Sequence, residues 1–405
     1  MLNKERRPLL ISLYNTVFSI GEGKKLNFDG LVKKARNNTG HGNLGPDFND
    51  DSLKILIKSI NEEAGLHPFG QLMIREKLIS QIENRLWAEY WFHKYPEILK
   101  QDVLPIVLVT GLQRTGTTKM QRLLSEQAGA RGLMSWEALY PAPIGNKNET
   151  KKRIARTKRN ERAVRWISPT FHTIHPIHTH KPEEDVLLLD VHFMSTSSEA
   201  IMHVPTYANW LSKQDATEAY RYEKKLLQLL QWQRSGGFWV IKSPHHLLHL
   251  ENFLSVFPKT KVIWMHRQPE QCVPSFLSML YYSRSMFVKD VDKDLIKAHW
   301  LPKIKAMLRS GIEFDARHPD RILDVYFSDF MQMERSVLGD VHAFIKENRK
   351  KNGAMNNTYH KSFQSKHRYT LMDWGLNPHM IQQEFDFYNK AFFKSAETSE
   401  YSEQR

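Results

Sequence analysis

Residues 105–118 read PIVLVTGLQRTGTT, and this stretch decides the fold. It opens with a short apolar run, 105–110, that is rich in β-branched residues, which is typical of a buried strand. A loop with two glycines follows at once, and residues 117–127 are expected to form a helix. The stretch therefore predicts a strand, a tight loop and a helix in direct succession.

Further strands are expected along the chain, each a short apolar run with helical stretches around it. The strand candidates are 238–241, 261–265 and 321–327, and the helical stretches are 215–234, 245–256, 269–284 and a last one that ends near 346. Strands separated by helices indicate a parallel sheet covered on both faces. The expected fold class is α/β, a P-loop-like three-layer α/β/α arrangement around a central parallel sheet of about four to five strands.

The segment before this core carries apolar residues at helical spacing, most clearly at 51–64 and 69–95. After the core, the polar segment 346–366 is expected to be a mobile surface loop, and a last helix is expected at 378–393. The chain is accordingly divided into an N-terminal helical region at 1–103, a core at 104–346, and a C-terminal loop and helix at 347–405 that packs on the core.

Composition narrows the class of protein. The 405 residues hold 58 Lys and Arg against 44 Asp and Glu, a formal charge of +14, which favours an anionic ligand or surface. Cys272 is the only cysteine, so a disulfide framework within the chain and a Cys-based zinc site are excluded. No apolar run reaches the length of a membrane span, and residues 9–20 do not resemble a secretory signal. We expect a cytoplasmic protein.

The glycine loop has the properties of an anion site. The first backbone N–H groups of the following helix lack partners within the helix, and the helix dipole adds positive potential. Gly111 and Gly116 permit the tight turn, and Arg114 adds a charged fork. Thr117 and Thr118 add hydroxyl donors at the helix start. A bound nucleotide phosphate is therefore expected here.

The loop differs from the ATPase pattern G-x-x-x-x-G-K-[ST] at one position. The two glycines have the right spacing, but Thr117 stands where the lysine that reaches the β- and γ-phosphates belongs. Its absence argues against an ordinary ATPase or kinase. An arginine before the second glycine and two threonines after it better suit a 5′-phosphosulfate, whose sulfuryl group leaves from a single phosphate.

At this point the sequence resembles the sulfotransferase superfamily, which uses 3′-phosphoadenosine 5′-phosphosulfate (PAPS) and carries a loop of the form [KR]-[ST]-G-T-[ST]. A second segment, WMHRQP at 264–269, ends a strand candidate, and Ser275 lies eight residues after Arg267. In the superfamily an arginine and a serine at this spacing hold the 3′-phosphate. The resemblance thus implies PAPS-binding residues at Arg114, Thr115, Gly116, Thr117, Thr118, Arg267 and Ser275.

Later segments resemble a mostly bacterial branch of that superfamily. WVIKSPHHL at 239–247 is similar to its K-S-P-x-H-L segment, and further likenesses lie at 181–185, 326–330 and 367–376. The resemblance covers about residues 104–390 and implies PAPS as co-substrate with no metal required. Because sulfotransferases often place a basic loop late in the chain, Arg368 is expected to touch the 3′-phosphate.

Sulfuryl transfer requires a base for the acceptor hydroxyl and a cation that neutralises charge on the bridging oxygen. Arg114 and Lys242 are the candidates for the second task, because Lys242 ends a strand candidate beside the loop. For the base, His245 is slightly favoured, since a histidine at a helix start has a lowered pKa. Glu184, or its neighbour Glu183, is the alternative, because other members of the superfamily use a glutamate.

Two weaker patterns lie between the loop and these residues. His172, His175, His178 and His180 are spaced like metal ligands, but we interpret them as part of a polar loop near the acceptor pocket, and no metal site is expected. Residues 151–165 contain eight basic residues and one acid. This segment is expected to be a helix with a solvated face that contacts an anionic acceptor or steers the charged co-substrate.

The sequence therefore predicts a PAPS-dependent sulfotransferase that acts on a hydroxyl or amine of a small-molecule, lipid or carbohydrate acceptor. Nucleic acid is not an expected partner, since no stacking pattern or known binding fold supports it. Two alternatives stay open, a P-loop kinase or NTPase, and a non-catalytic nucleotide-binding module.

Overall fold

The computed structural model describes residues 7–18, 25–347 and 370–393. Within them, five parallel strands form one sheet in the order β2-β3-β1-β4-β5. The strands are β1 (Ile106–Gly111), β2 (Ala130–Gly132), β3 (Phe238–Lys242), β4 (Lys261–His266) and β5 (Ile322–Tyr326). The glycine loop follows the central strand, so it lies between neighbours on both sides. The predicted α/β fold with a parallel sheet is confirmed.

Alternation along the strands divides the sheet into two apolar faces. Val107 and Val109 of β1 pack in a cluster with residues of α5 (Thr117–Ser125), α16 (Phe327–Gln332) and α17 (Glu334–Glu347). Ile106 and Leu108 belong to the larger cluster on the opposite face, which includes α12 (Thr217–Gln233), α14 (Pro269–Ser285) and α15 (Lys293–Arg317). Both faces are thus covered, as a parallel sheet requires.

The predicted core elements agree with these bounds to within a few residues, but several differences remain, and the long helix α15 was not among the predicted stretches. β2 was not predicted, because three residues are too few to show a pattern. The helix expected at 245–256 is a 3₁₀ helix, η3 (Pro244–Leu248), followed after His249 by α13 (Leu250–Val256). The stretch that ends near 346 is two helices, α16 and α17, which meet at Met333.

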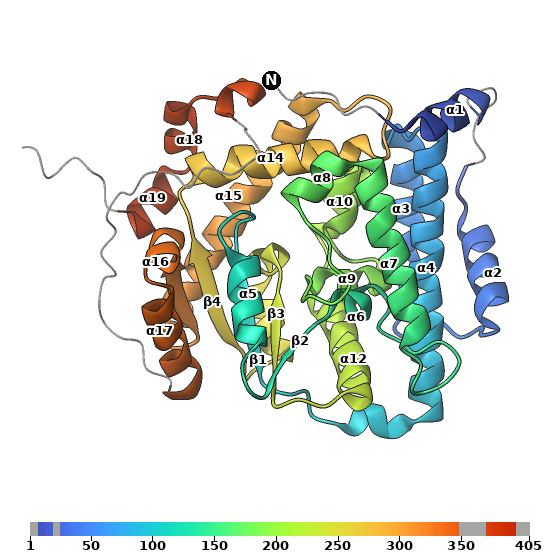
Figure 1. Cartoon of the computed structure of the whole chain (residues 1–405), viewed down its shortest axis with the longest axis horizontal. Coiled ribbons are helices and arrows are strands. Elements are labelled where there is room, and N and C mark those ends of the chain that lie inside the picture. The colour runs from blue at the N-terminus through green and yellow to red at the C-terminus, as the bar shows by residue number, and fades with distance from the viewer. Residues whose placement is uncertain (1–6, 19–24, 348–369, 394–405) are drawn as a thin grey trace, which may run out of the picture.

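The N-terminal segment forms helices, as expected. They are α1 (Leu9–Phe18), α2 (Phe28–Thr39), α3 (Asp50–Glu63), α4 (Pro68–Lys94) and the 3₁₀ helix η1 (Pro96–Lys100). Figure 1 shows α2, α3 and α4 at the end of the molecule opposite α17. Their apolar residues join the larger cluster of the sheet. The division at residue 103 stays a prediction.

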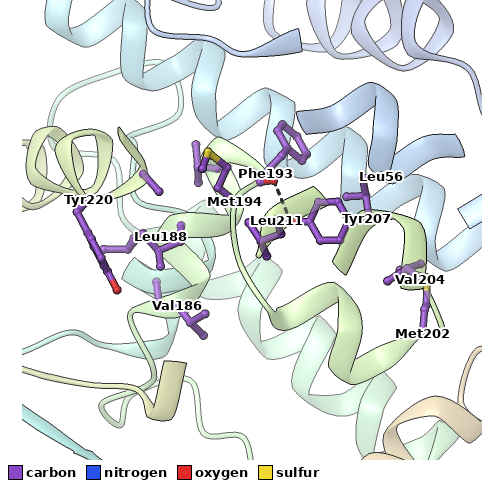
Figure 2. Packing of buried hydrophobic residues seen from close by; sticks show 14 of the residues in the cluster. Leu56, Val186, Leu188, Phe193, Met194, Met202, Val204, Tyr207, Leu211 and Tyr220 are labelled. Carbon is purple, nitrogen blue, oxygen red and sulfur yellow. Dashed lines mark hydrogen bonds between the residues drawn. The ribbon is translucent and has the colours of Figure 1, made fainter. Parts of the chain in front are cut away.

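Residues 130–220 link the N-terminal helices to the sheet through short helices. These are α6 (Ser135–Leu139), α7 (Lys151–Ile167), α8 (Pro169–Ile174), α9 (Val186–Leu189), η2 (Asp190–His192), α10 (Ser197–Ile201) and α11 (Pro205–Leu211). Figure 2 shows Tyr207 of α11 near Leu56 of α3, with the Tyr207 hydroxyl donating to the Phe193 carbonyl at 2.9 Å. Buried contacts of this kind fix the segment 186–220 against the N-terminal helices.

The C-terminal part returns to the sheet. It consists of η4 (Leu371–Trp374), α18 (Pro378–Glu384) and α19 (Asp386–Phe392), so the expected single helix at 378–393 is broken at the fully buried Phe385. Tyr388 bonds to His266 at the end of β4 (2.9 Å). Most of the loop expected at 346–366 lies outside the described residues. Nowhere in the described ranges is a helix both long and apolar enough to cross a membrane.

Buried histidines make the fold sensitive to acid. Burial, and then the charge of Arg7, lowers the pKa of His67 to about 4, and burial, and then Arg85, lowers the pKa of His192 to about 3. Because these pKa values are lowered below the unfolded value, their contribution to stability is complete above about pH 6.5 and is lost as the pH falls towards 4. Because each histidine binds a proton more readily in the unfolded chain, each should reduce the free energy of unfolding by about 2 kcal/mol when the pH falls from 7 to 5.

We predict that His67→Asn removes its share of this loss. Nδ1 of His67 accepts from the Gly70 N–H at 2.8 Å and caps α4, and asparagine can keep that cap without titrating. Chemical unfolding at pH 7 and pH 5 should show a pH-dependent loss smaller by about 2 kcal/mol in the variant. An equal loss in both proteins would contradict the assignment.

Candidate functional site

The loop after β1 turns through unusual backbone conformations. Gly111 has a φ of 143°, Arg114 of 74° and Gly116 of 91°. A Cβ atom at Gly111 would lie 2.5 Å from the carbonyl oxygen of Met265, so only glycine fits between β1 and β4. The Thr115 hydroxyl donates to the Leu112 carbonyl at 2.7 Å and closes the turn. This turn places the N-terminus of α5 at the carboxyl end of the sheet.

The helices after β1 and β4 leave the sheet on opposite faces. α5 packs on the face of Val107 and Val109, whereas α14 packs on the face of Leu108. Two adjacent parallel strands with helices on opposite faces form a topological switch point, where open α/β sheets bind ligands. The crevice at the ends of β1 and β4 is therefore the candidate binding site.

Three of the predicted nucleotide-binding residues meet in this crevice. Nη1 of Arg267, which follows β4, donates to the Arg114 carbonyl at 2.9 Å. Nε of Arg114 donates to the Ser275 hydroxyl of α14 at 3.1 Å. The guanidinium of Arg267 also lies 4.3 Å from the centre of the Phe327 ring. Arg267 and Ser275 lie 153 and 161 positions after Arg114 in the sequence, yet all three meet in one cationic cluster beside the start of α5.

Lys242 and Glu184 form a second pair at the carboxyl end of β3. Nζ of Lys242 lies 2.7 Å from Oε1 of Glu184, and the Ser243 hydroxyl donates to Oε2 of Glu184 at 3.4 Å. The Lys242 side chain is 2% exposed and that of Glu184 is 22% exposed. The Thr110 hydroxyl of β1 donates to the Ser243 carbonyl at 2.9 Å, which ties this pair to the strand that precedes the loop.

The backbone N–H of His245 donates to the Ser243 hydroxyl at 3.2 Å, but its imidazole contacts other residues. Its Nδ1 bonds to the Thr196 hydroxyl at 3.1 Å, and its ring centre is 5.2 Å from that of His249. Burial, and then the neighbouring His249, lowers the pKa of His245 well below its usual value. The imidazole is therefore neutral at pH 7 and has a weakened affinity for a proton.

The carboxylate of Glu183, the other acidic alternative, makes a local contact. Its Oε1 accepts from the backbone N–H of Glu184 at 3.1 Å, and its carbonyl oxygen accepts from Nε2 of Gln121 on α5 at 3.0 Å. Neither acid opens a helix, because α9 begins at Val186. The two carboxylates bond to different partners.

The remaining predicted positions are Thr117, Thr118, Arg368 and the four histidines. Thr117 and Thr118 open α5 as expected, and Arg368 lies outside the described residues. The rings of His172 and His178 are 6.4 Å apart at their centres. In the described part of the chain, no group of three or more His, Cys, Asp or Glu is placed to hold a metal ion.

Some residues of the crevice were not singled out from the sequence. Thr110 and Thr196 hold Ser243 and His245, and nothing in a single sequence marks such hydroxyls. Phe327 contacts Arg267 and approaches Gly116, where an added Cβ would lie 3.0 Å from its ring. Its position within 326–330, one of the segments of resemblance, was the available signal.

Comparison with known proteins shows a family and two solved structures that are similar to the chain. A model described as the sulfotransferase family matches residues 105–350. The crystal structure of sulfotransferase STF1 from Mycobacterium tuberculosis H37Rv is similar, with 26% identity, a TM-score of 0.76, and coverage of 90% of this chain and 99% of that one. Sulfotransferase STF9 from Mycobacterium avium shares the fold, with 22% identity, a TM-score of 0.78, and coverage of 93% and 99%. No curated protein sequence matches the chain.

We predict that Gly111→Ala is far more damaging than Gly129→Ala. Both glycines have a positive φ, but a Cβ at Gly129 meets nothing within 4 Å, whereas one at Gly111 meets the Met265 backbone. Gly129→Ala should lower the free energy of unfolding by about 1 kcal/mol and Gly111→Ala by about 3 kcal/mol or more, as measured by chemical denaturation. Equal effects would show that the close approach of β1 and β4 is not a constraint.

Proposed function

Because the chain belongs to the sulfotransferase family, an enzyme family that uses PAPS, we propose that it transfers a sulfuryl group from PAPS to a hydroxyl or amine of a small-molecule, lipid or carbohydrate acceptor. The observation that carries this proposal is the meeting of Arg114, Arg267 and Ser275 at the β1–β4 crevice, with the Lys242–Glu184 pair at the neighbouring strand end.

In this proposal the nucleotide binds by its two ends. The unpaired N–H groups at the start of α5 and the hydroxyls of Thr117 and Thr118 hold the 5′-phosphosulfate. Arg267 and Ser275 hold the 3′-phosphate, since a guanidinium and a hydroxyl are good donors to phosphate oxygens. The missing lysine at Thr117 makes the same loop a poor site for a triphosphate.

The transfer step is assigned to the strand ends beside the loop. The acceptor hydroxyl gives its proton to the Glu184 carboxylate while its oxygen forms a bond to sulfur. The bond between sulfur and the bridging oxygen breaks, and 3′-phosphoadenosine 5′-phosphate leaves. The Lys242 ammonium and the Arg114 guanidinium donate to that oxygen as negative charge develops.

Glu184 is preferred to His245 as the base on three grounds. Its carboxylate contacts Lys242, it is partly exposed where an acceptor can reach it, and it sits beside the loop strand through Ser243 and Thr110. His245 is 6% exposed, and its Nδ1 is engaged by Thr196. We therefore assign His245 a positioning role on the acceptor side.

We predict that Arg267→Gln weakens binding of the 3′-phosphate more than binding of the rest of the nucleotide. Affinity for 3′-phosphoadenosine 5′-phosphate should fall about 10- to 100-fold, because one charge-assisted hydrogen bond to the 3′-phosphate is lost. Affinity for AMP, which lacks that phosphate, should fall by a clearly smaller factor, because AMP loses only the support that Arg267 gives to the loop through the Arg114 carbonyl. Isothermal titration calorimetry measures both.

The matched control is Arg317→Gln, an exposed arginine at the end of α15 that makes a surface ion pair with Glu251 and donates to the Glu313 carbonyl of its own helix. It should alter neither affinity. Equal losses of both nucleotides in the Arg267 variant would mean that Arg267 only supports the loop through Arg114.

We predict that Glu184→Gln lowers kcat about 10²- to 10⁴-fold, because the carboxylate can no longer take the acceptor proton. Affinity for 3′-phosphoadenosine 5′-phosphate should stay unchanged. His245→Gln should keep kcat within about tenfold. Turnover is followed as transfer of label from ³⁵S-PAPS to whichever member of a panel of phenols, sugars and lipids the unmodified enzyme sulfates. The reverse order of effects would restore His245 as the base.

A further inference from the structure

A cleft of about 520 Å³ opens between α5, α7 and the segment that leads to Glu184. Its size is within the range of sites that hold small molecules. It is lined by Arg122 of α5, by Lys158, Glu161, Arg162 and Arg165 of α7, and by His178, Thr179, His180 and Lys181. Five of these nine residues are Lys or Arg, two are His and one is acidic, so the cleft is cationic.

The single acid of the cleft is already occupied. Oε2 of Glu161 accepts from the backbone N–H and the hydroxyl of Thr179 at 3.1 and 2.7 Å, and its Oε1 lies 3.2 Å from Nη2 of Arg165. Glu161 thus fastens the histidine-rich segment to α7 and neutralises one arginine. Glu161 does not neutralise the other cations of the cleft.

Those other cations lack acidic partners of their own. Among the residues that the structure describes, Arg122, Lys158 and Arg162 form no ion pair. Nε of Arg122 is buried and has no hydrogen-bond partner in that same part of the chain. Lys181 has only a distant, exposed contact with Glu126 at 3.8 Å. A group of guanidinium and ammonium donors without acceptors is a site for an anion.

The cleft adjoins the proposed reaction centre. Arg122 lies five residues after Thr117, which places it about 7.5 Å along α5 from the start of the helix. Gln121, beside it, donates to the Glu183 carbonyl at 3.0 Å, and the chain runs from Lys181 in the cleft to Glu184 at Lys242 within three residues. A small molecule bound in the cleft can therefore extend to the proposed base, Glu184.

The cleft also lies on the other flank of the loop from the proposed 3′-phosphate residues. α5 packs against β2 and β3, on one side of β1, whereas Arg267 and Ser275 follow β4 on the other side. The residues proposed for the two ends of the nucleotide do not line the cleft. The cleft is therefore free for the acceptor.

We propose that this cleft binds an anionic ester group, a phosphate or a sulfate, that the acceptor already carries, while the acceptor's hydroxyl lies at Glu184. The inference rests on the proposed sulfotransferase function and adds the class of acceptor. The arginines Arg122 and Arg162, which form no ion pair in the described part of the chain, suit such a group, because guanidinium forks match its oxygens in geometry and charge.

The test uses two double variants of α7 that remove the same charge. Lys158→Gln with Arg162→Gln empties the cleft of two cations. Lys152→Gln with Arg159→Gln is the control, because these residues are exposed on the same helix and do not line the cleft. Each protein is first saturated with 3′-phosphoadenosine 5′-phosphate, so that the nucleotide site is filled.

Calorimetry then measures binding of sucrose octasulfate, with sucrose as the uncharged comparison. We expect the unmodified protein to bind the sulfated sugar and not sucrose, the cleft variant to bind it at least tenfold more weakly, and the control variant to stay within threefold. Equal losses in both variants, or no binding by the unmodified protein to any anionic probe, would overturn the proposal.

A lipid arm identifies the source of the ester. Vesicles of phosphatidylcholine with phosphatidylglycerol are compared with phosphatidylcholine alone by co-sedimentation. Loss of vesicle binding in the cleft variant alone, without binding of the sulfated sugar, would support a phosphate ester on a lipid headgroup.

The failures of the two proposals are distinguishable. A cleft variant with weakened affinity for 3′-phosphoadenosine 5′-phosphate would assign the cleft to the nucleotide and overturn the acceptor inference. If the unmodified protein failed to bind that nucleotide at all, the proposed function would fall, while the same titration without nucleotide would still report on the cleft.

Discussion

The hydrogen bond from Arg267 to the carbonyl oxygen of Arg114 is the interaction on which the site depends. Arg114 has a φ of 74°, a conformation that costs a residue with a side chain about 1–2 kcal/mol. The bond to its carbonyl and the bond from its own guanidinium to Ser275 hold it there. Because these contacts join the loop after β1 to the elements after β4, the start of α5 is fixed relative to the crevice before any ligand binds.

The segment that follows Glu184 depends on the N-terminal helices in a comparable way. Lys77 and Gln81 of α4 both bond to Oδ2 of Asp190 at 2.9 Å, and Arg85 of α4 lies 2.9 Å from Nδ1 of His192. These contacts fix the segment that follows Glu184. The helical region therefore supports the residues that follow Glu184, and its apolar residues belong to one cluster with those on one face of the sheet.

Features that depend on neighbouring residues could be predicted from the sequence, whereas contacts between distant segments could not. β1 and α5 were predictable because residues 105–118 encode them locally, and β3, β4 and β5 because each is a short apolar run of its own. Arg267 and Ser275 were singled out because their spacing is a local motif, and the structure places both beside Arg114. The contact of Lys242 with Glu184 was not, since 58 residues separate them and nothing in either segment names the partner. The same holds for the cleft, where Arg122 meets α7 and residues 178–181. The break at Phe385 was missed because burial of that ring is a tertiary effect.

The central claim is that this loop and crevice bind a nucleotide with a 3′-phosphate and a single 5′-phosphate, and not a triphosphate. Calorimetric titration of the unmodified protein with 3′-phosphoadenosine 5′-phosphate and, separately, with ATP and magnesium tests it most directly. We expect saturable binding of the first nucleotide with at least a hundredfold preference over the second. Equal affinity for the two, or a preference for ATP, would contradict it.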